Sequence, residues 1–226
     1  VFLGLNGSNG LSVRSMGSGR VIWLSNELFL NFFLFIQPIM NVHIFAGGKS
    51  VGSSCIVLEG KEDAVVLDCG YNPVRPELGI DFVKMNSVRK KIRCVCITHS
   101  HVDHIGMLPW LTKFINSPVY MTPPTLELLP IVMDDVHSTT QIFTDDDFKK
   151  CYSQCEQIVP GETKRVTPSL SLRCMYAGHA IGAVMFEVRL DGIITVYTGD
   201  YDVSPSYLIR GAEFSPHDVD YIITES

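Results

Sequence analysis

The sequence predicts a layered α/β fold from three observations. Short apolar runs bounded by turn residues fill positions 41–100, which is typical of β-strands. Longer runs with helical spacing follow at positions 107–158, and strand-like runs return at positions 170–226. Strands, then helices, then strands again favour stacked layers that share a hydrophobic core.

Four strands are expected in the first of these regions. Positions 41–48 and 54–60 are joined by the glycine-rich stretch AGGKSVG, which lacks the spacing of a nucleotide-binding loop. A strand rather than a helix follows it, so we interpret the stretch as a hairpin turn. The third strand, 63–70, ends in Asp-Cys-Gly, and the fourth, 93–100, ends at a histidine cluster.

The second and third regions are predicted to contain helices and then strands. Helices are expected at 107–115, 124–136 and 145–158. Asp145 and Asp147 suit the N-terminus of the last helix, and Asp134 and Asp135 are interpreted as solvated. The final strands are expected at 170–180, 183–190, 192–202 and 219–226.

The net charge of the chain restricts the kinds of molecule that it is expected to bind. The formal net charge of −6 argues against nucleic-acid binding through the overall field, but it excludes neither a local basic path nor a metal site. The basic run VRKKIR contains Arg89, Lys90, Lys91 and Arg93. We interpret this run as a solvated loop, with contact to an RNA backbone as the alternative.

Two further features concern the domain boundary and the cellular compartment. Residues 1–39 combine a Gly/Ser-rich stretch with an apolar run that polar residues interrupt, so we expect a disordered or appended leader rather than an anchor or signal peptide. Ordered patterning begins after Met40, which gives a domain at 40–226. The 7 cysteines include no Cys-x-x-Cys pair, which favours reduced, buried thiols in the cytosol or nucleus.

The stretch THSHVDHIG contains the strongest chemical signal in the chain. It places His99, His101, Asp103 and His104 within six positions at the end of a strand. Neutral imidazoles and carboxylates are zinc ligands. Alternation in an extended backbone sends His99 and His101 to the same side, whereas Asp103 and His104 follow a turn. This spacing suits two metal positions.

Three other strand ends offer candidate ligands. His179 in YAGHAIGA and Asp200 in VYTGDYD each follow an apolar strand, and Asp68 ends the strand VVLDCG. Taken singly, each would be interpreted as a turn residue. Together with the histidine cluster, His179 and Asp200 are interpreted as further ligands, while the position of Asp68 relative to the cluster stays open. Three other histidines lack such companions and are interpreted as ordinary strand or surface residues: His43, His137 and His217.

These motifs resemble a known family. VLDCG, THSHVDHIG, AGHAIGA and TGDYD, in this order, are similar to the successive motifs of the metallo-β-lactamase fold. YIITES resembles the acidic motif that opens the β-CASP region of the RNA-processing branch. The resemblance implies an αββα sandwich truncated before the β-CASP insertion, so that residues 40–226 would form the N-terminal part of the metallo-β-lactamase domain.

The resemblance also implies a set of site residues. Two Zn²⁺ ions would be held by six side chains: His99, His101, Asp103, His104, His179 and Asp200. In the family pattern one zinc is held by His99, His101 and His179. The other zinc is held by Asp103 and His104, and Asp200 bridges both. Asp68 would orient the ligands through hydrogen bonds. Glu225 would be the acidic residue that partners a distant histidine, and Asp68, Asp103 and Glu225 are the expected catalytic residues.

The implied activity is that of a zinc-dependent RNA endonuclease in pre-mRNA 3′-end or small nuclear RNA processing. The expected partners are RNA and other subunits of a 3′-end processing or Integrator complex, including a related metallo-β-lactamase/β-CASP subunit. No association with a membrane is expected. The expected localisation is the nucleus, with the cytoplasm as the alternative. A small-molecule hydrolase of the glyoxalase II type and a non-catalytic scaffold are the competing interpretations.

The chain departs from the family pattern at two places. Ser100 stands where a bulky aromatic is usual, and Ser206-Tyr207-Leu208 stands where Asp-Arg-His-Leu is usual. These departures affect the fit of the substrate and leave the metal ligands intact. We expect little or no activity from this segment alone.

Overall fold

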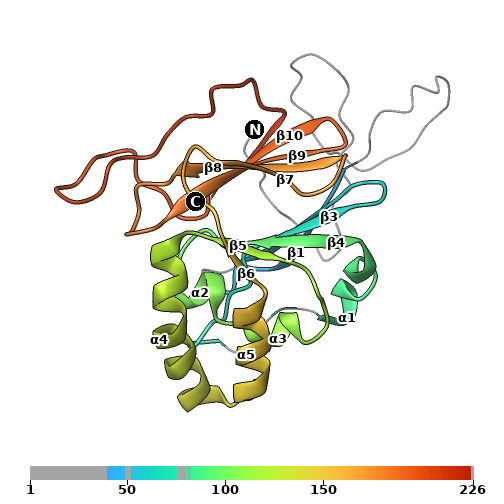
Figure 1. Cartoon of the computed structure of the whole chain (residues 1–226), viewed down its shortest axis with the longest axis vertical. Helices are drawn as coiled ribbons and strands as arrows, with labels where there is room; N and C mark the ends of the chain where they lie inside the picture. Colours follow the sequence, from blue (N-terminus) through green and yellow to red (C-terminus); the bar gives the residue numbers. More distant parts are fainter. Residues whose placement is uncertain (1–39, 49–51, 76–79, 81, 225–226) are drawn as a thin grey trace.

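The computed structural model describes residues 40–48, 52–75, 80 and 82–224. Two β-sheets lie face to face, and helices cover the outer side of one of them (Figure 1). This arrangement confirms the predicted layered α/β class. The leader predicted at residues 1–39, as well as Glu225, lies outside the described residues.

The first sheet positions half of the candidate site. Its strand order is β1 (Asn41–Ala46), β2 (Cys55–Glu59), β3 (Ala64–Leu67), β4 (Ile92–Cys96), β5 (Val119–Met121) and β6 (Cys155–Gln157). The strands from β3 to β6 run parallel to one another, and the β1–β2 and β2–β3 pairs are antiparallel. Parallel strands place their carboxyl ends at one edge of the sheet. Asp68 directly follows β3 and the histidine cluster follows β4, so both lie at that edge.

The helices pack on the outer face of the first sheet (Figure 1). They are α1 (Phe82–Met85), the 3₁₀ turn η2 (Arg89–Lys91), α2 (Val102–Ile105), α3 (Leu108–Thr112), α4 (Pro123–Thr140) and α5 (Asp145–Ser153). The predicted acidic start of α5 is confirmed as a capping box, because Thr144 and Asp147 each bond the other's backbone N–H. Leu111, Leu129 and Met133 bury their side chains against Val66 and Val95 of the sheet.

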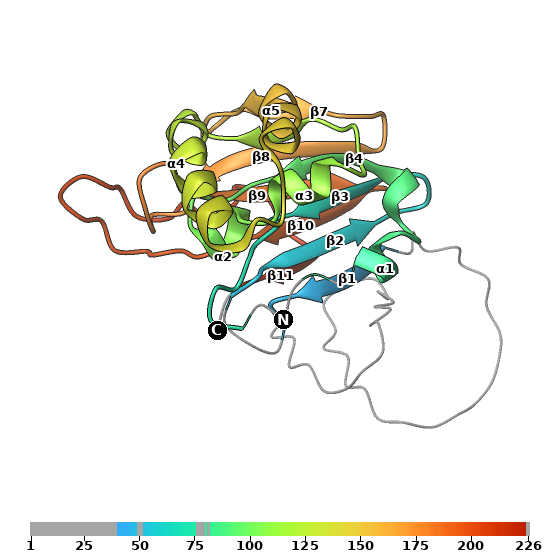
Figure 2. The same ribbon diagram turned by 90° about the horizontal axis from the view of Figure 1, so that it is seen from below.

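The second sheet supplies the other half of the site. Its order is β11 (Tyr221–Ile223), β10 (Ile193–Tyr197), β9 (Val184–Leu190), β8 (Leu170–Tyr176) and β7 (Thr163–Arg165) (Figure 2). Alternating inward residues such as Leu172, Phe186 and Val188 pack against Leu58 and Leu67 of the first sheet. The loop between β10 and β11 lies over the outer face of the second sheet. In the described residues, no helix covers this face.

Several short elements differ from the expectation. The helix expected at 145–158 ends at Ser153, and Cys155–Gln157 forms β6, in which Cys155 pairs with Val119. A three-residue strand gives no periodicity to distinguish it from the end of a helix. The cysteines are free, as expected, and all except the half-buried Cys155 are buried. Within the described part of the chain, no helix has the length and hydropathy to cross a membrane.

Candidate metal centre

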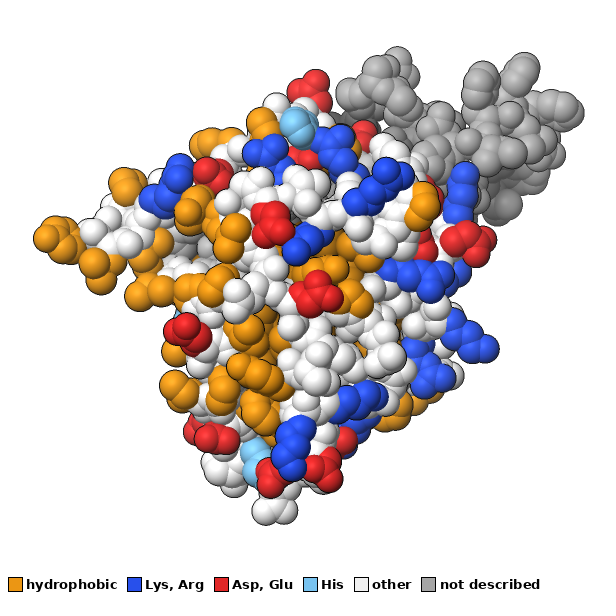
Figure 3. All heavy atoms as spheres, viewed as in Figure 1, with side chains coloured by type: hydrophobic (Ala, Val, Ile, Leu, Met, Phe, Trp, Pro, Cys, Tyr) orange, Lys and Arg blue, Asp and Glu red, His pale blue; other side chains and the backbone are white. Residues whose placement is uncertain are grey.

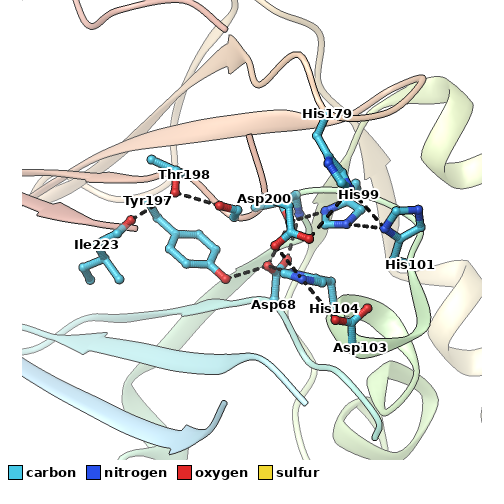
Figure 4. Close-up of polar contacts among 12 residues, drawn as sticks. Asp68, His99, His101, Asp103, His104, His179, Tyr197, Thr198, Asp200 and Ile223 are labelled. Atoms are coloured by element: carbon cyan, nitrogen blue, oxygen red, sulfur yellow. Dashed lines mark hydrogen bonds and ion pairs between the residues drawn. The ribbon is translucent and has the colours of Figure 1, made fainter. Parts of the chain in front are cut away.

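The predicted ligands meet at the edge where the two sheets lie against each other (Figure 4). His99 and His101 follow β4, His179 follows β8, and Asp200 follows β10. One potential ligand atom from each of these four side chains lies within 4.8 Å of all the others. Residues separated by about a hundred positions in the sequence therefore converge on one point.

One ring nitrogen of each of these three histidines faces a ring nitrogen of another. His99 Nε2 lies 3.0 Å from His101 Nδ1, and His179 Nε2 lies 3.2 Å from the same His101 atom. Asp200 Oδ2 is 3.7 Å from His179 Nε2. Three imidazoles and a carboxylate in such an arrangement are compatible with binding a divalent metal.

The remaining two predicted ligands lie on the other side of Asp200. His104 Nε2 is 3.1 Å from Asp200 Oδ1 and 3.7 Å from Asp103 Oδ2. The two carboxylate oxygens of Asp200 therefore face different histidines, Oδ1 toward His104 and Oδ2 toward His179. The structure brings all six predicted ligands together, with Asp200 between the two groups.

Asp68 lies directly beneath the ligands and is fully buried. Its Oδ1 accepts a hydrogen bond from the Thr98 backbone N–H at 2.8 Å. Its Oδ2 accepts from the Thr98 hydroxyl at 2.8 Å, the Tyr197 hydroxyl at 2.7 Å and His104 Nδ1 at 2.7 Å (Figure 4). The sequence left open where Asp68 lies relative to the histidine cluster. In the structure Asp68 contacts the cluster directly, through His104.

The bonds to Asp68 also orient His99. The Thr98 hydroxyl donates its single hydrogen to Asp68, so it accepts from His99 Nδ1, which lies 3.0 Å away. His99 therefore carries its proton on Nδ1 and directs the Nε2 lone pair into the pocket. His104 is held in the same sense by the direct bond from its Nδ1 to Asp68.

Electrostatics give two of the candidate ligands, His99 and Asp200, the protonation states in which they can bind a metal. Burial, together with nearby His104 and His101, lowers the pKa of His99 to about 2, so its imidazole is neutral. The hydrogen bond from His104 lowers the pKa of Asp200 to about 2 despite partial burial. Burial of His104 lowers its pKa, but the Asp68 and Asp200 carboxylates outweigh burial and raise the pKa to about 10. Burial and Asp68 raise the pKa of Tyr197 well above its usual range, so the phenol stays a donor.

Close backbone packing explains why the loop after β3 ends in Asp-Cys-Gly. A Cβ on Gly70 would lie 1.6 Å from the Asp103 carbonyl oxygen, so only glycine fits there. Cys69 N–H donates to the His104 carbonyl at 2.8 Å, and Tyr71 N–H donates to the Val102 carbonyl at 2.9 Å. These bonds fix Asp68 relative to the histidine cluster.

A second close approach joins the loops after β8 and β10. Gly178 has a positive φ of 78°, and a Cβ there would lie 2.1 Å from the Asp202 carbonyl oxygen. Asp202 N–H donates to the Ala177 carbonyl at 2.9 Å. The glycine of AGHAIGA therefore allows the loop of His179 to lie against the loop of Asp200.

Two functional partners were missed by sequence reasoning. Thr98 and Tyr197 bond Asp68, yet each was interpreted as part of a strand. Alternation along β10 could have placed Tyr197 on the inward face, but nothing in the sequence indicates which inward residue reaches Asp68. The other three histidines lie apart from the described cluster: His43 contacts Glu59, His137 packs near Phe143, and His217 is exposed.

The chain has a metallo-β-lactamase fold. The sequence profile described as the Metallo-beta-lactamase superfamily matches residues 49–141, which include the 99–104 cluster. A metallo-beta-lactamase mutant from Cronobacter sakazakii is similar in structure, with a TM-score of 0.51 at 16% identity over 72% of this chain and 64% of that one. The subclass B3 enzyme MEM-A1 from a soil metagenome gives a TM-score of 0.50 at 17% identity over 74% and 62%.

The chain is also similar in sequence to curated proteins. The chain is 32% identical to Integrator complex subunit 11 of Gallus gallus over 204 residues, which cover 84% of this chain and 34% of the relative. It is 29% identical to cleavage and polyadenylation specificity factor subunit 3-II of Arabidopsis thaliana, over 81% of this chain and 32% of that protein. The chain thus spans about a third of the length of these relatives.

Proposed function

We propose that the chain is the metal-binding part of a zinc-dependent RNA endonuclease. The observation that supports this most directly is the convergence of six ligand side chains on two adjacent positions, with the oxygens of Asp200 directed one toward each. The similarity to an Integrator subunit and to a cleavage and polyadenylation factor subunit supports RNA as the substrate.

Two zinc ions fit the donor set. His99, His101 and His179 would hold the first ion, Asp103 and His104 the second, and Asp200 would contact both. Two zinc ions at adjacent positions supply Lewis acidity toward a phosphate and lower the pKa of the attacking water. The chain's own contribution is to hold imidazole nitrogens and carboxylate oxygens at fixed positions, with the imidazole of His99 neutral before a metal binds.

The three residues predicted to be catalytic have different roles in this proposal. Asp68 positions the ligands, because it is buried and bonds His104 directly and His99 through Thr98. Asp103, whose side chain is 28% exposed, would face both the second metal and the substrate. Glu225 would contribute the acidic motif of the β-CASP branch.

The reaction would be hydrolysis of an RNA phosphodiester, leaving a 3′-hydroxyl and a 5′-phosphate. In the proposed setting residues 40–226 are the N-terminal part of a metallo-β-lactamase domain, within a larger nuclear complex for pre-mRNA 3′-end or small nuclear RNA processing. The partners would be RNA and other subunits, including a related metallo-β-lactamase/β-CASP protein. The segment alone should cleave RNA weakly or not at all.

Metal analysis and substrate assays test the proposal together. We expect the zinc-loaded chain to contain two zinc ions, and the His101→Ala variant to contain about one. In single-turnover assays with excess protein, any RNA cleavage should yield 5′-phosphate ends and disappear in His101→Ala. A chain without bound zinc would support a scaffold, and zinc-dependent hydrolysis of a glutathione thioester without RNA cleavage would support the glyoxalase II alternative; either result contradicts the proposal.

A further inference from the structure

A second polar site lies on the outer face of the second sheet. A cavity of about 130 Å³ is lined by polar side chains from β7, β8, β9 and the β10–β11 loop: Thr163, Ser171, Arg173, Glu187, Arg189 and His217. Ser171 lies near the start of β8, whereas His179 of the metal centre follows the end of that strand. The cavity is therefore separate from the metal centre by most of the length of β8.

The one carboxylate in the cavity lining is already neutralised. Glu187 is 1% exposed, and its Oε1 accepts from Arg189 Nε at 3.0 Å and from Arg189 Nη2 at 2.9 Å. Its Oε2 accepts from the Ser215 hydroxyl at 2.6 Å. Because the Glu187 carboxylate and the Arg189 guanidinium satisfy each other, they leave no net charge in the cavity.

One of the remaining lining residues, Arg173, has a buried donor atom without an acceptor among the described residues. Arg173 Nε is buried and has no hydrogen-bond partner, and none of the described carboxylates forms an ion pair with this guanidinium. The Thr163 and Ser171 hydroxyls and the His217 ring lie around the same cavity. Figure 3 shows Lys and Arg side chains, with Asp and Glu side chains between them, over the strands of this sheet. An uncompensated buried cation donor is costly unless an acceptor is supplied.

We propose that this cavity binds a phosphate-type oxyanion. A guanidinium donates two parallel hydrogen bonds to such an anion, and the hydroxyl and imidazole groups on the other walls would donate to the phosphate oxygens that Arg173 does not reach. A neutral ligand would leave the charge of Arg173 unpaired, and a cation would be repelled by it. The phosphate group could come from free inorganic phosphate or from the 5′ end of an RNA.

Calorimetric titration of the full chain with inorganic phosphate tests this site. We expect saturable binding that weakens at least about tenfold in Arg173→Gln and that Arg173→Lys restores in part. Thr163→Ala, which removes one donor and no charge, should weaken binding by a smaller factor. The His101→Ala variant, which alters only the metal centre, should bind phosphate at this site as the unmodified chain does.

Two results would overturn the inference. One is that the unmodified chain binds no phosphate; the other is that Arg173→Gln binds as tightly as the unmodified chain while its circular dichroism shows a native fold. Competition by 5′-phosphorylated and 5′-hydroxyl RNA tetranucleotides then separates the two sources. Displacement of inorganic phosphate by the phosphorylated oligonucleotide alone would identify an RNA end, and displacement by neither would identify free phosphate.

Discussion

The four histidines of the metal centre form two pairs that the fold holds differently. His99 and His104 are 0% and 3% exposed, and each directs Nδ1 into a hydrogen bond that leads to Asp68. His101 is exposed and His179 is 30% exposed, and among the described residues their ring nitrogens contact only other candidate ligands. In the proposed arrangement, each metal position has one histidine anchored to Asp68.

This difference indicates which histidines the fold orients by itself and which a bound metal would order. The inner pair is fixed before metal binds, because burial and the hydrogen bonds that lead to Asp68 restrict the orientation of both rings. The outer pair can be ordered by the metal itself, at the expense of side-chain entropy. Loss of an outer histidine should therefore affect one metal position, whereas loss of the Asp68 carboxylate should affect both.

Asp68→Asn should have the largest effect. An amide retains the shape and tolerates the positive φ of 58°, but it cannot accept from all of Thr98, His104 and Tyr197. Breaking a buried charged network should lower the unfolding free energy by about 3–5 kcal/mol. Zinc affinity should fall about 10–100-fold at both positions. Urea unfolding and chelator competition measure the two effects, and a variant that retains normal affinity at either position would contradict the shared anchor.

His101→Ala should separate metal binding from stability. The side chain is exposed and contacts only other ligands, so the unfolding free energy of the metal-free chain should change by less than about 0.5 kcal/mol. The zinc content should nevertheless fall from two ions to about one. A large loss of stability in the metal-free variant would show that the outer pair is also part of the folded scaffold.

Tyr197→Phe should give a smaller version of the Asp68 effect. The substitution removes one buried hydrogen bond and leaves the Thr98 and His104 bonds to Asp68 in place. We expect a loss of about 1 kcal/mol in unfolding free energy and a few-fold decrease in zinc affinity at both positions. If the affinity of only one position changes, Tyr197 acts on one histidine rather than through Asp68.

Sequence reasoning selected the candidate ligands, which the structure brings together, more completely than the residues that support them. His99 to His104 lie in one short motif, and His179 and Asp200 follow strong apolar strands, so residue type and strand ends were sufficient to find them. Asp68, by contrast, could be selected but not placed. Its contacts depend on which parallel strands are neighbours, and the local spacing of apolar residues does not predict the order of strands in a sheet.

The same limit explains the supporting residues and the short elements that were missed. Tyr197 occupies an ordinary inward position of β10, and only the face-to-face packing of the two sheets brings its hydroxyl to Asp68. Strands β5, β6 and β7 each have three residues, which is too few to show alternation. Cys155 consequently seemed to continue a helix, although it pairs with Val119 in the sheet.

Asp63→Asn should have the smallest effect on zinc binding and provides the control for the other substitutions. Asp63 also joins the two sheets: it accepts hydrogen bonds from Arg93, Thr167 and Ser169, and its side chain is 8% exposed. It has no contact with the metal centre among the described residues. The substitution should cost about 1–2 kcal/mol of unfolding free energy at pH 7 and leave the zinc content at two.

The pH dependence of this loss follows from the direction of the pKa shift. Burial raises the pKa of Asp63, but the bonds from Ser169, Thr167 and Arg93 outweigh burial and hold the pKa below its usual range. A lowered pKa in the folded state stabilises the fold fully above the unfolded value of about 4, and the contribution is lost as the pH falls through the folded value. The difference between Asp63→Asn and the unmodified chain should therefore shrink below about pH 4, as urea unfolding at several pH values will measure. If Asp63→Asn instead lost zinc at pH 7, general rigidity of the sandwich, rather than the particular bonds of Asp68, would account for the anchored pair of histidines.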